Sequence, residues 1–474
     1  MPSRLFRTGL LVFCVCACAA AYAGGLFPTR AEAADPPAPV DSHPVTVLVF
    51  PFENESRVAN LDWLGEGLSE LTSERLLDRG VNVLTRQDRL AALEKMGLPD
   101  TTRLSHAMIV KIAGEADADV AVFGRFISDG KTVTLEAHIL QISPPSLSPV
   151  LTQSGDLQGL MRVHSRLSWQ ILCLVDGKNC PPEGANRDES SFSEPPPSLR
   201  MDAMENFIRG FVGMDDDVRL RLLREASRLE PSWDRPPFEL GQMYFERRDC
   251  ETALPWFSRV PPARPDGPEA SFNAGVCHLI RNDAARADAT FSVLIDRSRS
   301  SEIKERLPEF PEVRNNLGVA QLRQGKWNEA EIEFERAAVL DSDEPDYWVN
   351  LGIAKLAGKQ AAGAIAPLER ARNIDPDDKD ARALLIATLE SVGRGADAAT
   401  IRAEAGRPEA SEGAAHAATL NVQDPDVLVK MARISDKFDR ALLRTTNEDP
   451  ATRPATHVPR GNEGKHGENN RGPK

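Results

Sequence analysis

The chain has 474 residues, a formal net charge of -14 and a pI near 5.2, so it lacks the basic character of a general nucleic-acid-binding protein. Apolar residues make up 41% of the sequence, which is enough to bury packed cores, and the length allows about two to four domains. We therefore expect several folded domains and no nucleic-acid partner.

The first 23 residues have the pattern of a signal peptide. Two arginines give a positive start, residues 10–21 form an apolar run too short to span a bilayer, and residues 21–23 (Ala-Tyr-Ala) offer a signal peptidase site. The alternatives are an uncleaved anchor, cleavage after Ala33, and lipidation at Cys18. We expect an exported protein, periplasmic or outer-membrane associated, with membrane attachment only through a lipid at Cys18 or through a partner.

A proline-rich spacer is predicted for residues 24–43, and an α+β domain, a mixed sheet with flanking helices, for residues 44–176. The clearest element is a hairpin of two alternating strands joined by Asp129-Gly130, which supplies a positive-φ turn. The pattern predicts strands at 45–50, 81–84, 120–126, 132–140 and 149–153, and helices at 61–79, 87–96, 105–115 and 156–175.

Three motifs of this domain carry a resemblance to a known family. They are residues 47–52 (Val-Leu-Val-Phe-Pro-Phe), 62–68 (Asp-Trp-Leu-Gly-Glu-Gly-Leu) and 118–124 (Ala-Asp-Val-Ala-Val-Phe-Gly). With the Asp129-Gly130 hairpin they resemble the TolB amino-terminal-like domain of the bacterial envelope, which is related to the FlgO and CsgG groups. The resemblance implies assembly with envelope partners, and it supplies no catalytic residue.

Four cysteines remain once the signal peptide is removed, and export makes disulfides permissible. Cys173 and Cys180 are close in sequence at the edge of the domain and are the better candidates for a disulfide, with buried or idle thiols as the alternative. Residues 177–198 are rich in Pro, Ser, Glu and Asp and are predicted to be a disordered linker.

Glycines then recur at a fixed interval. Gly241 and Gly275 are 34 residues apart, as are Gly318 and Gly352, and each is followed by an alanine twelve residues later and by Phe or Leu four residues beyond that. This pattern resembles the tetratricopeptide repeat, whose helix hairpins stack into an all-α solenoid. The resemblance covers residues 199–410, with clear units at 234–267, 268–301, 311–344 and 345–378 and a degenerate unit on either side.

After the repeats, residues 411–444 are predicted to form a capping helix, because apolar residues from Val427 to Leu442 follow one helical face. Residues 445–474 are polar and predicted to be disordered.

Within each unit, the second, fifth, sixth, ninth and twelfth residues of the first helix are expected to face a concave groove. The sixth residues of three successive units are Asn273, Asn316 and Asn350. A carboxamide can donate to a backbone carbonyl and accept from a backbone N–H, so such a row would hold an extended peptide. The other candidate groove residues are Phe238, Phe245, Phe272, Leu322, Arg323, Val349 and Ile353.

Three alternatives stay open for this groove. The asparagines can serve their own backbone or a neighbouring helix. The groove can also be the docking surface for the chain's own tail or first domain. A carboxylate clamp is the third alternative, and only Arg235 and Arg323 are suitably placed for it.

No pattern in the sequence indicates catalysis, a cofactor or a metal site. The eight histidines are scattered, without the short spacing to carboxylates that metal sites use, and Gly65-Glu66-Gly67 lacks the third glycine of a dinucleotide turn. The sequence thus predicts a non-enzymatic interaction scaffold of the bacterial cell envelope, with a protein or peptide partner in the groove. The alternative is a sensory protein whose first domain binds a small molecule and whose repeats relay that event.

Overall fold

The computed structural model describes residues 45–56, 58, 60–100, 104–176, 199–299, 307–403 and 420–444. The predicted signal peptide, the spacer, Cys18, the linker at 177–198 and the tail at 445–474 lie outside the described residues.

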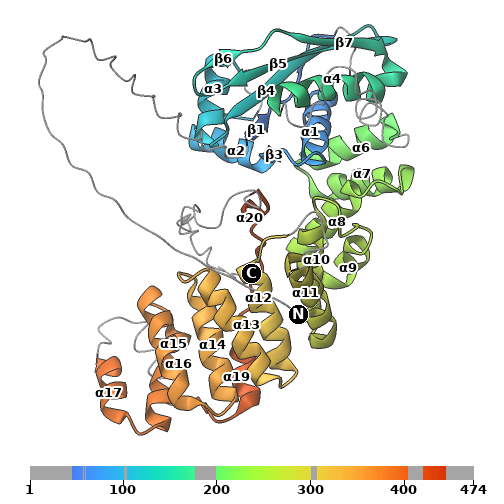
Figure 1. The fold of residues 1–474 in the computed structure, drawn as a ribbon. Helices are drawn as coiled ribbons and strands as arrows, with labels where there is room; N and C mark the ends of the chain where they lie inside the picture. The colour runs from blue at the N-terminus through green and yellow to red at the C-terminus, as the bar shows by residue number, and fades with distance from the viewer. Residues whose placement is uncertain are drawn as a thin grey trace, which may run out of the picture. The chain divides into compact units, whose positions relative to one another are not determined.

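The first domain contains a seven-stranded mixed sheet (Figure 1). Its main path has the order β3-β1-β4-β5-β6, while β2 pairs with β4 and β7 pairs with β5. β1 is parallel to β3 and β4, and β4 and β5 form the predicted antiparallel hairpin, whose Gly130 has a φ of +88°. The strands are β1 Thr46–Val49, β2 Glu53–Asn54, β3 Asn82–Val83, β4 Val120–Ser128, β5 Thr132–Gln141, β6 Ser146–Leu147 and β7 Leu151–Asp156.

Helices cover both faces of this sheet. α1 (Trp63–Leu77) and α4 (Leu160–Val175) share a core with Val47 and Val49, whereas α2 (Arg86–Lys95) and α3 (His106–Glu115) share a core with Leu48 and Phe50. Successive side chains of a strand point to opposite faces, so an apolar β1 fits a strand that is buried on both sides. The predicted fold class is confirmed.

The glycines of the domain's motifs allow close packing. A Cβ atom on Gly65 would overlap the carbonyl oxygen of Phe52, and one on Gly124 would lie 2.7 Å from the Phe52 ring. The segment after β1 is therefore pressed between α1 and β4. Gly65 serves this packing inside a helix, not a nucleotide-binding turn.

From residue 201 to residue 403 the described chain consists of helix hairpins that follow one another (Figure 1). The pairs are α6 Met201–Val212 with α7 Asp216–Leu229, α8 Arg235–Glu246 with α9 Cys250–Phe257, α10 Gly267–Ile280 with α11 Ala284–Arg299, α12 Pro311–Arg323 with α13 Trp327–Leu340, α14 Pro345–Ala357 with α15 Ala361–Ile374, and α16 Lys379–Ser391 with α17 Gly395–Ala403.

The recurring glycine allows the two helices of a hairpin to touch. A Cβ atom on Gly318 would lie 2.7 Å from the ring of Phe334, which is fully buried, and the other three glycines have the same relation to Phe257, Phe291 and Leu368. A methyl group there would displace the ring that fills the hairpin. The 34-residue pattern is therefore the packing rule of the array.

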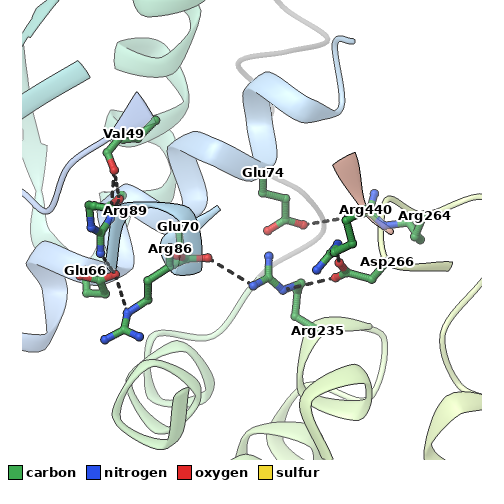
Figure 2. Close-up of polar contacts among 11 residues, drawn as sticks. Val49, Glu66, Glu70, Glu74, Arg86, Arg89, Arg235, Arg264, Asp266 and Arg440 are labelled. Carbon is green, nitrogen blue, oxygen red and sulfur yellow. Dashed lines mark hydrogen bonds and ion pairs between the residues drawn. The ribbon is translucent and has the colours of Figure 1, made fainter. Parts of the chain in front are cut away.

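Polar contacts join α1 to the array (Figure 2). Arg235, at the start of α8, lies 3.2 Å from Glu70 and 3.6 Å from Asp266. Arg264 contacts Glu74 at 2.8 Å. Burial raises the pKa of Glu74 to about 7, although both arginines favour its charged form. These ion pairs tie the first domain to the first repeats.

One disulfide links neighbouring repeats. Cys250 of α9 is bonded to Cys277 of α10, with their Cα atoms 5.1 Å apart, and the sequence did not single out this pair. Cys173 is also disulfide-bonded, and Cys180, its predicted partner, lies outside the described residues.

In the part of the chain that the structure describes, no helix combines the length and the apolar character needed to cross a membrane.

Candidate peptide-binding groove

The predicted capping helix is only partly formed. α19 covers Pro425–Met431, residues 432–439 have no helical or strand assignment, and α20 covers Ala441–Arg444. The prediction of one helix across this region was wrong. We call residues 432–440 the tail segment, and its backbone groups bond to side chains of the array.

Two of the predicted asparagines hold the backbone of the tail segment. Nδ2 of Asn350 donates to the carbonyl of Arg433 and its Oδ1 accepts from the N–H of the same residue, both at 2.8 Å. Asn316 repeats this arrangement on Ser435, at 2.7 Å to the carbonyl and 2.9 Å to the N–H. Both asparagines are fully buried. These are the paired bonds that the sequence predicted for a bound peptide, and the peptide is the chain's own.

Asn273 does not take part in the same way. Its Nδ2 donates to Oε1 of Gln242 at 2.5 Å. Of the three asparagines in the predicted row, only Asn316 and Asn350 each make a pair of hydrogen bonds to the tail segment. Asn273 instead bonds to a neighbouring helix, which is one of the alternatives left open by the sequence.

Two further groove residues were not singled out from the sequence. Asn315 donates to the carbonyl of Arg433 at 3.0 Å and to the hydroxyl of Ser435 at 3.1 Å. The side-chain Oδ1 of Asn315 accepts a hydrogen bond from Nδ2 of Asn350 at 2.7 Å. Glu312 accepts from the backbone N–H of Asp439 at 2.8 Å. Asn315 and Glu312 are the fifth and second residues of the unit 311–344, and both positions are expected to face the groove. The position within the repeat could therefore have identified both residues as groove residues.

Acidic side chains bind both ends of the tail segment. Arg433 contacts Asp346 at 2.7 Å and Asp378 at 2.6 Å. At the other end, Arg440 pairs with Asp266 and lies 3.1 Å from Glu269. Glu269, Glu312 and Asp346 are the second residues of three successive units, so one register position places an acidic row along the groove.

An aromatic pocket lies between these ends. The ring of Phe438 packs against Phe310 at 4.6 Å and Phe272 at 5.3 Å between ring centroids. The guanidinium of Arg440 lies over the ring of Phe238 at 5.7 Å. Two of the predicted groove aromatics thus contact the tail segment directly.

The remaining predicted groove residues have other surroundings. Leu322, Val349 and Ile353 are fully buried in the apolar cluster that Ile434 and Phe438 pack against. Phe245 pairs with the ring of Phe257 at 6.3 Å between centroids.

The two arginines considered for a carboxylate clamp are engaged elsewhere. Arg323 donates to the carbonyl of Leu279 at 2.5 Å, and Arg235 pairs with the acidic residues described above. The structure does not assemble a carboxylate clamp from this pair.

We expect the double substitution Asn316→Ala and Asn350→Ala to free the tail segment. Each change removes two hydrogen bonds to the tail segment and leaves backbone groups without their partner, which costs about 1–3 kcal/mol per site. Limited proteolysis should then cut within residues 432–440 at least several times faster than in the wild type. Asn273→Ala is the matched control, since its side chain bonds to Gln242, and equal cleavage in all three proteins would contradict the assignment.

The carboxyl group of Glu312 predicts a pH dependence. Burial raises its pKa to about 7, against the ordinary 4.5, although the N–H of Asp439 favours the charged form. The carboxylates of Asp439 and Asp341 add to the rise. Because the folded protein binds more protons than the unfolded chain between these values, stability should fall as the pH rises through 7.

We expect Glu312→Gln to remove this part of the pH dependence, on the order of 2 kcal/mol. Glutamine keeps an acceptor for the N–H of Asp439 and cannot ionise. Melting temperatures at about pH 5 and about pH 8 measure the effect, with exposed Glu329→Gln on α13 as the control. A pH slope identical to that of the wild type would show that Glu312 does not titrate in this window.

The first domain contains a pocket of about 870 Å³ beside the end of β1. Phe123 lies in its wall between His106 and His138, at 4.9 and 5.5 Å between ring centroids. Its arginines are paired with its glutamates: Glu66 contacts Arg86 at 3.1 Å and also contacts Arg89, and Arg125 contacts Glu55 at 3.2 Å and Glu136 at 2.6 Å (Figure 2 shows the first two pairs).

This pairing leaves the pocket without a net positive centre for an anion. Across the described ranges no group of three or more His, Cys, Asp or Glu side chains is arranged to hold a metal ion. The pocket is lined by both polar and apolar side chains.

Comparison with known proteins identifies the repeats. A sequence model of the tetratricopeptide repeat matches residues 303–345 and 315–379. No curated protein matches the chain.

Among solved structures, the chain is similar to YrrB, described as a TPR protein with an unusual peptide-binding site (15% identity, 44% of this chain and 96% of YrrB covered, TM-score 0.32). It is also similar to MamA from Desulfovibrio magneticus RS-1 (16% identity, 35% and 89% covered, TM-score 0.32). A third is the C-terminal domain of LpoB from Salmonella enterica (13% identity, 24% and 83% covered, TM-score 0.22). These similarities are too low to support an argument about function.

The hairpin geometry and the matched repeats define the class of the second part of the chain: it is a tetratricopeptide array following a mixed-sheet domain. Tetratricopeptide arrays generally act as non-enzymatic scaffolds that bind protein or peptide partners.

Proposed function

We propose that the protein is an interaction scaffold of the bacterial cell envelope whose groove binds an extended segment of a partner. The observation that carries the proposal is the pair of bonds that Asn316 and Asn350 each make to a backbone residue of an extended chain. Contacts to backbone groups hold a peptide by its extended shape, while pockets for its side chains add specificity. No catalytic role is part of this proposal.

Export rests on different observations. The first 23 residues have the pattern of a signal peptide, and lipidation at Cys18 remains an alternative means of membrane attachment. The disulfide between Cys250 and Cys277 supports an oxidising compartment, where such bonds persist. The resemblance of residues 44–176 to TolB amino-terminal-like domains supports a location in the envelope, where this domain would contact a second partner.

Site-specific photo-crosslinking in the native envelope tests the proposal. A crosslinking residue at Phe245, a predicted groove position, should capture a defined partner, whereas one at Ile332, which is 63% exposed on α13, should not. The experiment is carried out both with the tail segment intact and with the chain ended after Met431. Equal products from the two positions, or none in either chain, would contradict a binding groove.

A second candidate function, binding of a small molecule by the first domain, is favoured by the 870 Å³ pocket. A ligand that binds only the folded state raises the melting temperature by mass action. Thermal melts with polar metabolites should then show a rise that Arg125→Ala reduces. A panel without any shift would count against this candidate.

A further inference from the structure

Part of the contact between the tail segment and the groove involves only the segment's backbone groups. Within the tail segment, Asn316 and Asn350 bond to the carbonyl and N–H groups of Ser435 and Arg433, and Glu312 bonds to a backbone N–H. Any extended chain offers the same groups at the same spacing. These backbone contacts therefore do not by themselves distinguish this segment from an extended segment of another protein.

The side-chain contacts of the tail segment indicate which sequence fits the groove best. Arg433 meets two carboxylates at one end, and Arg440 meets Asp266 and Glu269 at the other. Between them, Phe438 fills the space between Phe272 and Phe310. The groove thus recognises a basic residue, an aromatic residue five positions later, and a second basic residue two positions beyond that.

The tail segment and the helix before it differ in how deeply their side chains are buried. Leu428 of α19 is fully buried, and Val422, which precedes α19, is also buried. By contrast, every residue from Met431 to Arg440 keeps part of its surface exposed to solvent. The tail segment has no fully buried side chain that would become exposed to solvent if the segment left the groove. We therefore expect that it can leave while α19 stays packed.

We propose that the tail segment is an internal mimic of the partner: it occupies the groove until an extended segment with the same basic–aromatic–basic pattern displaces it. This inference rests on the proposed function, since it requires that the groove binds a partner. A tethered segment competes at an effective concentration of about millimolar, so it lowers the apparent affinity for a partner while leaving the site itself unchanged.

Binding of a synthetic peptide tests the inference directly. The probe is a fluorescent peptide with the sequence of residues 430–442, and fluorescence anisotropy measures its affinity for the full-length mature protein. The double substitution Arg433→Ala and Phe438→Ala loosens the tail segment and leaves the groove intact. The chain ended after Met431 is a second open form, and Lys437→Ala, at an exposed position of the same segment, is the matched control.

Both open forms should bind the peptide at least about ten-fold more tightly than the wild type, and Lys437→Ala should behave like the wild type. Adding Asn316→Ala and Asn350→Ala to an open form should abolish this gain. A peptide in which the two arginines and the phenylalanine are alanine should bind at least about ten-fold more weakly to the open forms.

Two results would overturn the inference: equal affinity of the closed and open proteins for the peptide, or no binding by either open form. The proposed function fails separately, when crosslinking in the envelope finds no partner in either form. A gain in peptide binding without an envelope partner would therefore show that the tail segment closes the groove, and it would reject the scaffold together with the idea that the segment mimics a partner.

Discussion

Phe334→Ala is expected to destabilise the repeat array by about 3–5 kcal/mol. The ring is fully buried and lies against Gly318, so its loss opens a cavity between the two helices of one hairpin and the next. The rigid backbone contact at Gly318 limits how far the helices can collapse into that space. Thermal and urea unfolding followed by circular dichroism measure the change.

Ile332→Ala on the same helix is the matched control, since Ile332 is 63% exposed. Its effect should stay within about 0.5 kcal/mol. If the two substitutions destabilised the array equally, the glycine–aromatic contact would not be the packing rule of these repeats.

Arg235→Ala is expected to cost about 3–5 kcal/mol, because it removes the arginine that pairs with the buried carboxylate of Glu70, whereas Asp266 keeps Arg440. The Arg235 side chain is 19% exposed, and those of Glu70 and Asp266 are 13% and 12% exposed. Burial works against the charge of Arg235, but Asp266 and Glu70 outweigh it and raise its pKa. Burial already raises the pKa of Glu70 with Arg235 in place.

The loss in Arg235→Ala should shrink as the pH falls, because burial raises the pKa of Glu70 and its carboxyl group can then take up a proton. Arg228→Ala is the control, because Arg228 pairs with Glu225 on the surface and is 69% exposed, and such exposed pairs contribute little to stability. A loss in Arg235→Ala no larger than that in Arg228→Ala would show that these ion pairs do not hold α1 to the array.

The repeats were predictable because their packing depends on residues at fixed spacing. Gly318 and Phe334 are 16 residues apart in the sequence and touch in the structure, and the same relation recurs in three other units. The same register placed Asn316 and Asn350 in the groove. In a solenoid, residues at a fixed sequence spacing also contact each other in space, so the sequence pattern alone predicts the packing of the repeats.

The tail segment shows where periodicity misleads. Apolar residues from Val427 to Leu442 have helical spacing, yet the helix ends at Met431. An extended segment loses its own helical hydrogen bonds, and here the carboxamides of Asn316 and Asn350 replace them for Ser435 and Arg433. That compensation comes from residues more than 80 positions away, and no local pattern contains it.

The Cys250–Cys277 disulfide and the Arg235 ion pairs were not predicted from the sequence, because both join residues that are brought together only by the packing of separate elements. Cys250 and Cys277 are separated by 27 residues and meet only because adjacent hairpins stack. Arg235 is 165 residues from Glu70. Short sequence spacing favoured Cys173 and Cys180 as the candidate pair, and the packing of hairpins determined the bridge within the array.

Amide hydrogen exchange at Arg433 and Ser435 tests the central claim, that two asparagines hold the backbone of the tail segment. Both amides should exchange at least about ten-fold more slowly in the wild type and in Asn273→Ala than in the protein with Asn316→Ala and Asn350→Ala. Fast exchange of these two amides in the wild type, at the rate of an open chain, would contradict it.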